Sequence, residues 1–171
     1  MRGIIKPQHW KSSSINTSIP INTSYDDINA NVESACKRDL QWLGPSPVHQ
    51  GEIAIVGGGP SIKWNWKEIR KLQNAGVYVL ALNGAYNFLQ EKGIVADGMA
   101  MMDARKEINL HFAKRPRDKT TFFISSQTDP AVFDALEDHK VVLWHNEVGA
   151  DTTNIARRHR PGCLVVPPLG S

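Results

Sequence analysis

The sequence predicts an α/β fold built on a mostly parallel sheet. Short apolar runs rich in β-branched and aromatic residues alternate with segments whose apolar residues recur at helical spacing. Short connections containing Gly, Pro, Asn, Asp or Ser separate these segments. Regular alternation of strands and helices produces parallel strands side by side, with helices packed on both faces of the sheet.

The composition is that of one globular domain of ordinary size. The 171 residues are 41% hydrophobic, which is enough to form a core. The formal net charge is +3 and most Lys and Arg residues are scattered, so we expect no nucleic-acid partner. Cys36 and Cys163 are far apart and lack the spacing of metal ligands, which argues against a disulfide framework or a zinc site. We find no signal peptide or membrane-length apolar run, and therefore expect a soluble cytoplasmic protein without a membrane partner.

Two segments precede the predicted sheet. Residues 1–24 are predicted to be a flexible polar leader, because their second half is rich in Ser, Thr and Asn. Residues 25–50 are predicted to form a covering helix and a loop. The helix should span residues 25–43, with Asp26 or Asp27 as its N-cap and Gly44 as its stop. Its apolar residues fall four apart at Ile28, Val32, Cys36 and Leu40.

Residues 51–171 are predicted to form the main domain. Strands are predicted over residues 53–56, 77–82, 94–104, 120–125, 140–145 and 163–166. Helices are predicted from Ile62 to about residue 76, from Ala85 to Gly93, from Arg105 onward, and from Pro130 to about residue 138. Thr128 or Asp129 should cap the helix that begins with Pro130. Residues 146–159 are predicted to be a loop.

These elements predict a Rossmann-like three-layer sandwich. After the last predicted strand, residues 167–171 have the composition of another strand-to-helix turn. A fold of this kind normally continues past such a turn, so we expect the domain to be truncated at its C-terminus.

Ligands of open parallel sheets bind outside the carboxyl ends of the strands, where the strand order reverses. The candidate site therefore consists of the polar and glycine residues that lie at the carboxyl ends of the predicted strands or directly after them. They are Gly57, Gly58, Gly59, Pro60, Ser61, Asn83, Asp103, Ser125, Ser126 and His145.

The glycine turn, residues 57–61, connects the strand over residues 53–56 to the next helix. Glycine reaches φ > 0 freely and lets a ligand approach closely, and the amides of a helix N-terminus favour an anion. The turn nevertheless lacks the Gly-Lys pair of a P-loop. Ile62 stands at the third glycine position of the dinucleotide fingerprint. Phosphate binding and a simple chain reversal therefore both remain open.

The polar strand-end residues suit a phosphorylated or nucleotide ligand. Ser61 and the turn amides could bind phosphate oxygens, and Asn83 could bind a ribose or a base edge. Asp103 could hold Mg²⁺ through one carboxylate and water molecules. The alternative for both Asn83 and Asp103 is a helix cap. In the nucleotide interpretation the ligand is ATP or a nucleotide sugar.

The other strand-end residues are less specific. His145 is a candidate catalytic base or phosphate ligand, and a structural histidine is the alternative. Ser125 and Ser126 are candidate ligand-binding hydroxyls. They lack the nucleophile-elbow pattern and a Ser-His-Asp order, which argues against a hydrolase.

The run IVGGGPSI and the later segment VYVLALNGAYNFLQEKGIVADGMAMMDA resemble the domain of unknown function 115 family, which includes the MptE-like 6-hydroxymethylpterin diphosphokinases. The pattern is also similar to the amino half of bacterial sialyltransferases and to motility-accessory glycosyltransferases. The resemblance implies phosphate or nucleotide binding at Gly57, Gly59, Pro60 and Ser61, and a nucleotide contact at Asn83. It also implies a structural or metal role for Asp97 and Asp103. The sequence departs from the family at Ala104, where proline is frequent.

The resemblance implies an enzyme that binds Mg²⁺ and ATP at the glycine turn and transfers a diphosphate to a hydroxymethyl-type acceptor. Asp103 and His145 are its candidate catalytic residues. One alternative is a nucleotide-sugar-dependent, sialyltransferase-like glycosyltransferase. The other is a non-catalytic nucleotide-binding module. The partners expected in each case are small molecules, and the sequence leaves the acceptor and the oligomeric state open.

Overall fold

The computed structural model describes residues 23–45, 47, 50–107, 117–148 and 150–166. Nearly all of the predicted leader, most of the helix predicted after Arg105, and the predicted final turn lie outside the described residues.

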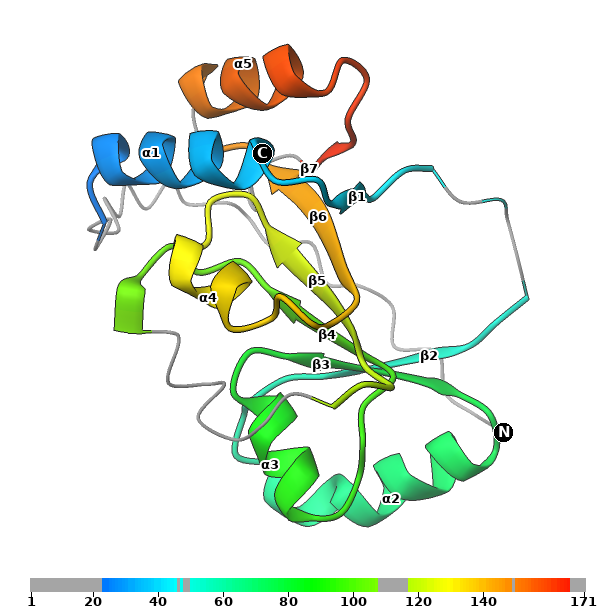
Figure 1. Cartoon of the computed structure of the whole chain (residues 1–171). Helices are drawn as coiled ribbons and strands as arrows, with labels where there is room; N and C mark the ends of the chain where they lie inside the picture. The colour runs from blue at the N-terminus through cyan, green and yellow to red at the C-terminus, as the bar shows by residue number, and fades with distance from the viewer. Residues whose placement is uncertain (1–22, 46, 48–49, 108–116, 149, 167–171) are drawn as a thin grey trace, which may run out of the picture.

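A parallel sheet of seven strands forms the centre of the molecule (Figure 1). Its strands are β1 (Gln41–Trp42), β2 (Ile53–Val56), β3 (Tyr78–Leu82), β4 (Gly98–Met101), β5 (Thr121–Ser125), β6 (Val141–Asn146) and β7 (Val165–Val166). The order is β1-β6-β5-β4-β3-β2, and β7 also pairs with β6. Every strand pair in this sheet is parallel. The predicted mostly parallel, Rossmann-like α/β fold is confirmed.

The described helices pack on one face of the sheet, whereas the sequence predicted helices on both faces. They are α1 (Tyr25–Cys36), α2 (Ile62–Asn74), α3 (Ala85–Glu91), α4 (Pro130–Asp134) and α5 (Ala150–His159). Strand pairing aligns Ala81, Met99, Phe122 and Val141 in one row, and these buried residues share a core cluster with residues of α1 to α4. Right-handed connections between strands in sequential order all fall on the same side of a sheet, which explains this arrangement.

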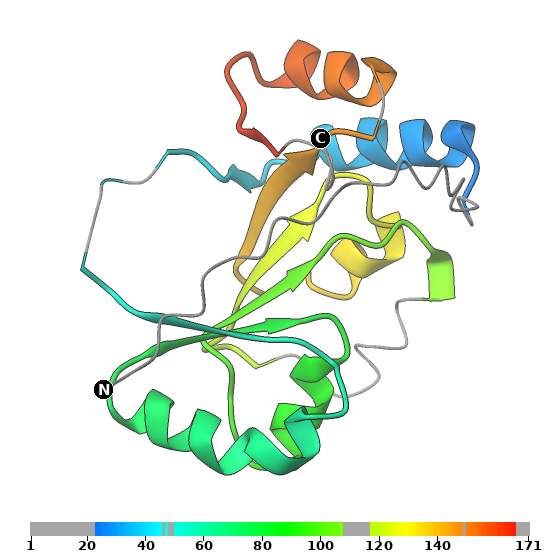
Figure 2. The same ribbon diagram turned by 180° about the vertical axis from the view of Figure 1, so that it is seen from behind.

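The strand order differs from the prediction in one respect. The strands from β2 to β6 follow one another across the sheet, so the described strands contain no reversal of order, and β2 lies at an edge. Ile53 and Ile55 of β2 face away from the helices and are 54% and 63% exposed. Figures 1 and 2 show that α2 and α3 lie at one end of the sheet and α1 and α5 at the other.

Three local predictions were wrong. The first helix ends at Cys36, and Gln41–Trp42 then pairs with β6, because Leu40 and Trp42 pack against the core. Ser24, rather than Asp26 or Asp27, caps α1, with its Oγ accepting a hydrogen bond from the amide of Asp27 at 3.1 Å.

The third error concerns the predicted loop over residues 146–159, most of which is α5. Few of its residues are apolar, so its helical pattern is weak. Burial of Ala156 against Ile28, Val32 and Cys36 of α1 stabilises the helix. None of the described helices combines the length and the apolar character needed to cross a membrane.

Candidate functional site

A cavity of about 510 Å³ lies at the carboxyl ends of the central strands. Residues that follow β3, β4, β5 and β6 line it, together with the start of α1. The lining residues are Thr23, Ile28, Asn83, Met102, Asp103, Ala104, Arg105, Gln127, Asn146 and Val148. We call it the strand-end cavity. It contains Asn83 and Asp103, which the sequence predicted, and four polar residues that the sequence analysis did not select, Thr23, Arg105, Gln127 and Asn146.

Asn83 lines the strand-end cavity directly after β3. Its φ is +46°, in the left-handed region, and Asn adopts this conformation more readily than most residues. The backbone is fixed on both sides, because the Asn83 amide donates to the Ala100 carbonyl at 3.1 Å and its carbonyl accepts from the Tyr86 amide at 3.2 Å. These hydrogen bonds fix the turn, and the turn places the exposed Asn83 side chain at the strand-end cavity.

Asp103 and Arg105 form a bidentate ion pair in the strand-end cavity. Arg105 Nη2 lies 2.5 Å from Asp103 Oδ2, and Arg105 Nε lies 3.0 Å from Oδ1. The Arg105 amide also donates to Oδ1 at 3.0 Å. The hydrogen bond with Asp103 raises the pKa of the Arg105 guanidinium. The pair presents both a cation and an anion to a ligand, and Arg105 is half exposed.

Gln127 and Asn146 form the buried side of the strand-end cavity. Gln127 Nε2 donates to the Met102 carbonyl, which follows β4. Asn146 Oδ1 accepts from Ser125 Oγ at 2.5 Å. Asn146 directly follows the predicted strand over residues 140–145, and Gln127 comes two residues after the predicted strand over residues 120–125. This position was the signal for finding them, but our selection stopped at the preceding residues.

Asn31 of α1 connects the loops that carry these groups. Its Nδ2 donates to the Gln127 carbonyl at 3.0 Å and to the Ala104 carbonyl at 3.4 Å. No local sequence pattern indicates this role, because the two acceptors are remote in the chain. Helix α1 therefore positions the cavity as well as covering the core.

Ser125, Ser126 and His145 are fully buried beside the strand-end cavity, and none is among its lining residues. His145 Nδ1 lies 2.7 Å from Ser126 Oγ, and Nε2 lies 3.4 Å from Thr153 Oγ1. Burial, followed by the nearby charge of Arg157, lowers the pKa of His145 to about 4. This geometry corresponds to the structural alternative for His145, in which the ring connects β5, β6 and α5.

The glycine turn is exposed and lies next to the cavity rather than in it. Gly58, Gly59 and Pro60 line a smaller hollow of about 370 Å³ with Lys63 and Gly84. Because Gly84 follows Asn83, the β3–α3 turn separates this hollow from the strand-end cavity.

One reason that the sequence offered for the glycine turn, a positive φ, was wrong. None of the three glycines has a positive φ, and a Cβ added at any of them would meet no atom within 4 Å. The first amides of α2 are also already paired, since those of Ile62 and Lys63 donate to the carbonyls of Gly59 and Pro60 at 3.2 and 3.3 Å. Neither local backbone conformation nor contacts within the described protein explain the run of glycines.

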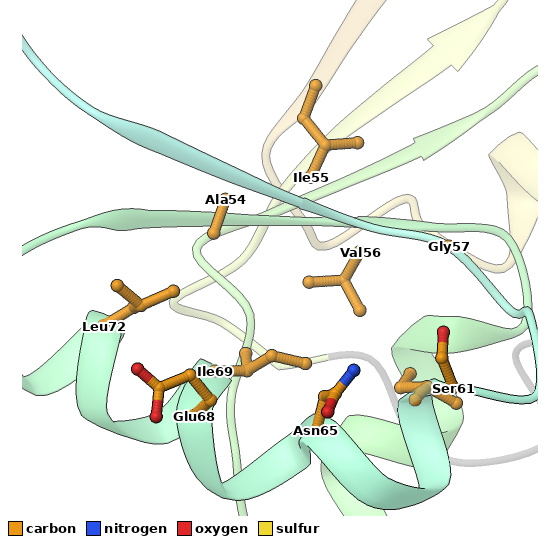
Figure 3. Close-up of a pocket in the computed structure, with 10 residues that line it drawn as sticks. Ala54, Ile55, Val56, Gly57, Ser61, Asn65, Glu68, Ile69 and Leu72 are labelled. Carbon is orange, nitrogen blue, oxygen red and sulfur yellow. The ribbon is translucent and has the colours of Figure 1, made fainter. Parts of the chain in front are cut away.

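A third hollow of about 500 Å³ lies between β2 and α2. Figure 3 shows Ala54 and Val56 pointing toward Ile69 and Leu72, whereas Ile55 points to the other side of the sheet. The lining is mostly aliphatic, and its polar side chains are those of Ser61, Asn65 and Glu68. We place the ligand in the strand-end cavity, which has more polar groups.

Asp97 lies directly before β4, at the amino end of the strand and therefore at the end of the sheet opposite the strand-end cavity. Its Oδ2 accepts from the Val79 amide at 2.8 Å and from Gln73 Nε2 at 3.2 Å. These bonds connect α2, β3 and β4, which is the structural role that the resemblance allowed.

The fit of Mg²⁺ depends on Asp103. The described residues contain no group of three or more acidic, His or Cys side chains that could hold a metal ion. Mg²⁺ often needs only one or two carboxylates plus phosphate oxygens and waters, and Asp103 offers one carboxylate beside the amide oxygens of Asn83 and Asn146. The residues fit this mode only if Arg105 releases an oxygen of Asp103.

The parallel sheet and the polar cavity at its strand ends define a Rossmann-like α/β protein with a candidate site at the strand ends. The family model described as 6-hydroxymethylpterin diphosphokinase MptE-like matches residues 25–161. The chain therefore belongs to the MptE-like family, as its glycine turn and following strands predicted.

Among solved structures, the chain is similar to the MAf glycosyltransferase from Magnetospirillum magneticum AMB-1. The TM-score is 0.60 and the sequence identity is 19%, over 74% of this chain and 21% of the glycosyltransferase. The match covers about a fifth of that protein and shows a common fold. No curated protein sequence matches the chain.

Proposed function

We propose that the chain is the nucleotide-binding part of a transferase, with diphosphate transfer from ATP to a hydroxymethyl-type acceptor as its reaction. The observation that carries the proposal is the convergence of Asn83, Arg105, Gln127 and Asn146 on one cavity at the carboxyl ends of the strands. Membership of the MptE-like family supports the choice of reaction.

In this proposal the nucleoside occupies the strand-end cavity, and the phosphates extend past Asn83 and Gly84 to the glycine turn. The turn suits phosphate because its glycines leave open space where a Cβ would lie. Lys63, at the adjacent hollow, adds a positive charge. This placement accounts for glycines that nothing within the described protein requires.

The reaction would need positioning and charge neutralisation more than covalent help from the protein. The acceptor hydroxyl oxygen attacks the β-phosphorus, the bond to the α–β bridging oxygen breaks, AMP leaves with the electron pair, and the hydroxyl proton passes to solvent. Arg105 would donate hydrogen bonds to phosphate oxygens. Asp103 would hold Mg²⁺, which supplies further charge neutralisation. We assign His145 to positioning β6, because its ring is buried.

A glycosyltransferase is the second candidate, and the Asp103–Arg105 ion pair favours it. A carboxylate that is already neutralised by a guanidinium binds Mg²⁺ less readily, whereas a nucleotide sugar could be held by Arg105 without a metal ion. The similarity in fold to a glycosyltransferase is compatible with this alternative. In that case Asn83 would contact the cytidine or uridine of the donor.

Thermal-shift measurements with ATP, CTP, CMP and UDP, each with and without Mg²⁺, test the proposal. A Mg²⁺-dependent shift with ATP, and AMP release when a hydroxymethylpterin is added, would support diphosphate transfer. A shift with CMP or UDP that needs no metal would support the glycosyltransferase. Binding without turnover of any donor would indicate a non-catalytic module, and no shift with any nucleotide would overturn both enzyme proposals.

The metal assignment has its own test. Asp103→Asn should abolish the Mg²⁺ dependence of the ATP shift, because it removes the carboxylate charge while preserving the size of the side chain. Asp39→Asn, a substitution at an exposed residue outside the cavity, is the matched control. Mg²⁺ dependence that persists in Asp103→Asn would show that the ion is held elsewhere.

A further inference from the structure

Gln127 has a buried side-chain acceptor without a partner. The residue is 8% exposed, and its Oε1 makes no hydrogen bond. Among the residues that line the strand-end cavity, Gln127 alone has such an atom in the described part of the chain. A buried acceptor without a hydrogen bond destabilises the fold, and a persistent one calls for an explanation such as a bound ligand.

The orientation of the Gln127 amide is fixed by its other end. Nε2 donates to the Met102 carbonyl, and a flipped amide would bring two oxygens together at that position. The backbone is held as well, because the Gln127 carbonyl accepts from Asn31 Nδ2 at 3.0 Å. Oε1 is therefore the side-chain atom of Gln127 whose hydrogen-bonding capacity the described protein leaves unsatisfied.

An oriented acceptor selects ligands by their donors. The exocyclic amino group of cytosine, adenine or a pterin can donate to Oε1, whereas the carbonyl oxygen at the matching position of uracil or hypoxanthine would repel it. Discrimination of this kind is strong when the polar group of the site is buried, because the wrong ligand leaves that group unpaired.

We propose that Gln127 makes the strand-end cavity selective for heterocycles that have an exocyclic amino group, by accepting a hydrogen bond from that group through Oε1. This inference rests on the proposed nucleotide site and specifies the chemical class of its base. It applies equally to a diphosphokinase that uses ATP and to a transferase that uses a cytidine nucleotide.

Isothermal titration calorimetry with two matched nucleotide pairs tests the inference. ATP is compared with ITP and CMP with UMP, because in each pair an oxo group replaces the amino group. The wild-type protein should bind the amino member of the pair that fits the cavity about tenfold more tightly than its oxo partner. Gln127→Met, which keeps the length of the side chain but removes the amide, should bring this ratio close to one.

Gln73→Met is the matched control, because Gln73 Nε2 also donates to a backbone carbonyl, that of Val95 at 2.7 Å, but lies outside the cavity. Its amino/oxo ratio should equal that of the wild type. Equal binding of both members by the wild type, or an unchanged ratio in folded Gln127→Met, would overturn the inference alone. Failure of all four nucleotides to bind would overturn the proposed function together with this inference.

Discussion

The strand-end cavity and the glycine turn are neighbours, but they are built in different ways. Hydrogen bonds from Asn31 and Gln127 hold the walls of the cavity, and the buried Ser126–His145 pair supports it from beneath. The glycine turn is exposed, and its glycines have no neighbour where a side chain would lie. The difference suggests a division of roles in which oriented side chains select the nucleoside and open backbone accepts the phosphates.

The largest expected effect concerns the support beneath the cavity. His145 has a pKa of about 4 in the folded protein, against about 6.5 in the unfolded chain. Between these two pH values the unfolded state therefore binds more protons than the folded state. The stability that the buried, neutral His145 contributes is complete above pH 6.5 and is lost as the pH falls toward 4. We expect the free energy of unfolding to fall by up to about 3 kcal/mol over this window.

Urea denaturation at several pH values measures this loss. His145→Gln should be less stable at pH 7 and should show a shallower decline below pH 6.5. If stability declines as steeply in His145→Gln as in the wild type, other groups cause the pH dependence. His145 would then not be the group that supports the cavity.

The cavity should lose its phosphate-binding cation in Arg105→Ala. This substitution removes a charge-assisted hydrogen-bond donor and the guanidinium charge that neutralises Asp103 in the cavity, so we expect nucleotide affinity to fall by roughly tenfold to a hundredfold. Calorimetry measures the loss. Arg158→Ala is the control, because Arg158 is largely exposed and its ion-pair distance to Glu33 is 3.9 Å. Equal losses in both variants would point to a general charge effect.

Asn31→Ala tests whether α1 positions the cavity. The substitution leaves the Gln127 and Ala104 carbonyls without their side-chain donor, and we expect the protein to be destabilised by about 1 to 2 kcal/mol, with weaker nucleotide binding. Urea denaturation and calorimetry measure the two effects. In Asn29→Ala, on the same helix, the buried Oδ1 that is removed has no hydrogen-bond partner among the described residues, so affinity should be unchanged. If Asn31→Ala binds as tightly as Asn29→Ala, α1 does not position the site.

The smallest effect on stability is expected at the glycine turn. Gly58→Ala introduces no contact within 4 Å and no unfavourable φ, so stability should be unchanged or higher by about 0.4 to 1 kcal/mol. Affinity for nucleotides should nevertheless fall several-fold, because the added methyl group occupies the space assigned to phosphate. Gly44→Ala, also without steric neighbours, is the control. Undiminished affinity in Gly58→Ala would place the phosphates elsewhere and break the proposed division of roles.

The apolar pattern of the sequence was enough to predict most of the sheet. The predicted strands over residues 53–56, 77–82, 120–125 and 140–145 correspond closely to β2, β3, β5 and β6. Each contains a continuous apolar run. Burial of such a run stabilises a strand, and it is the contribution that a local sequence pattern reveals most directly. The turn at Asn83 follows from the same boundaries, but the strand predicted over residues 94–104 is shorter in the structure, where β4 spans Gly98–Met101 and Asp103 lies beyond its end.

The structure changed the assignment of the other candidate residues. Ser126 and His145 end predicted strands, but their side chains point into the core, and only the pairing register determines which face each residue occupies. Helix α5 and strand β1 have weak local sequence patterns. Helix α5 is stabilised by packing against α1, and β1 is stabilised by pairing with β6.

The sequence by itself determined the parallel α/β class, the strand ends and the presence of the glycine turn. Only the tertiary structure decided that Arg105, Gln127 and Asn146 share one cavity with Asn83, and that the glycine turn lies beside it. Strand formation depends on side-chain pattern within a few residues, whereas the cavity depends on contacts such as Asn31 to Gln127, which join residues far apart in the chain.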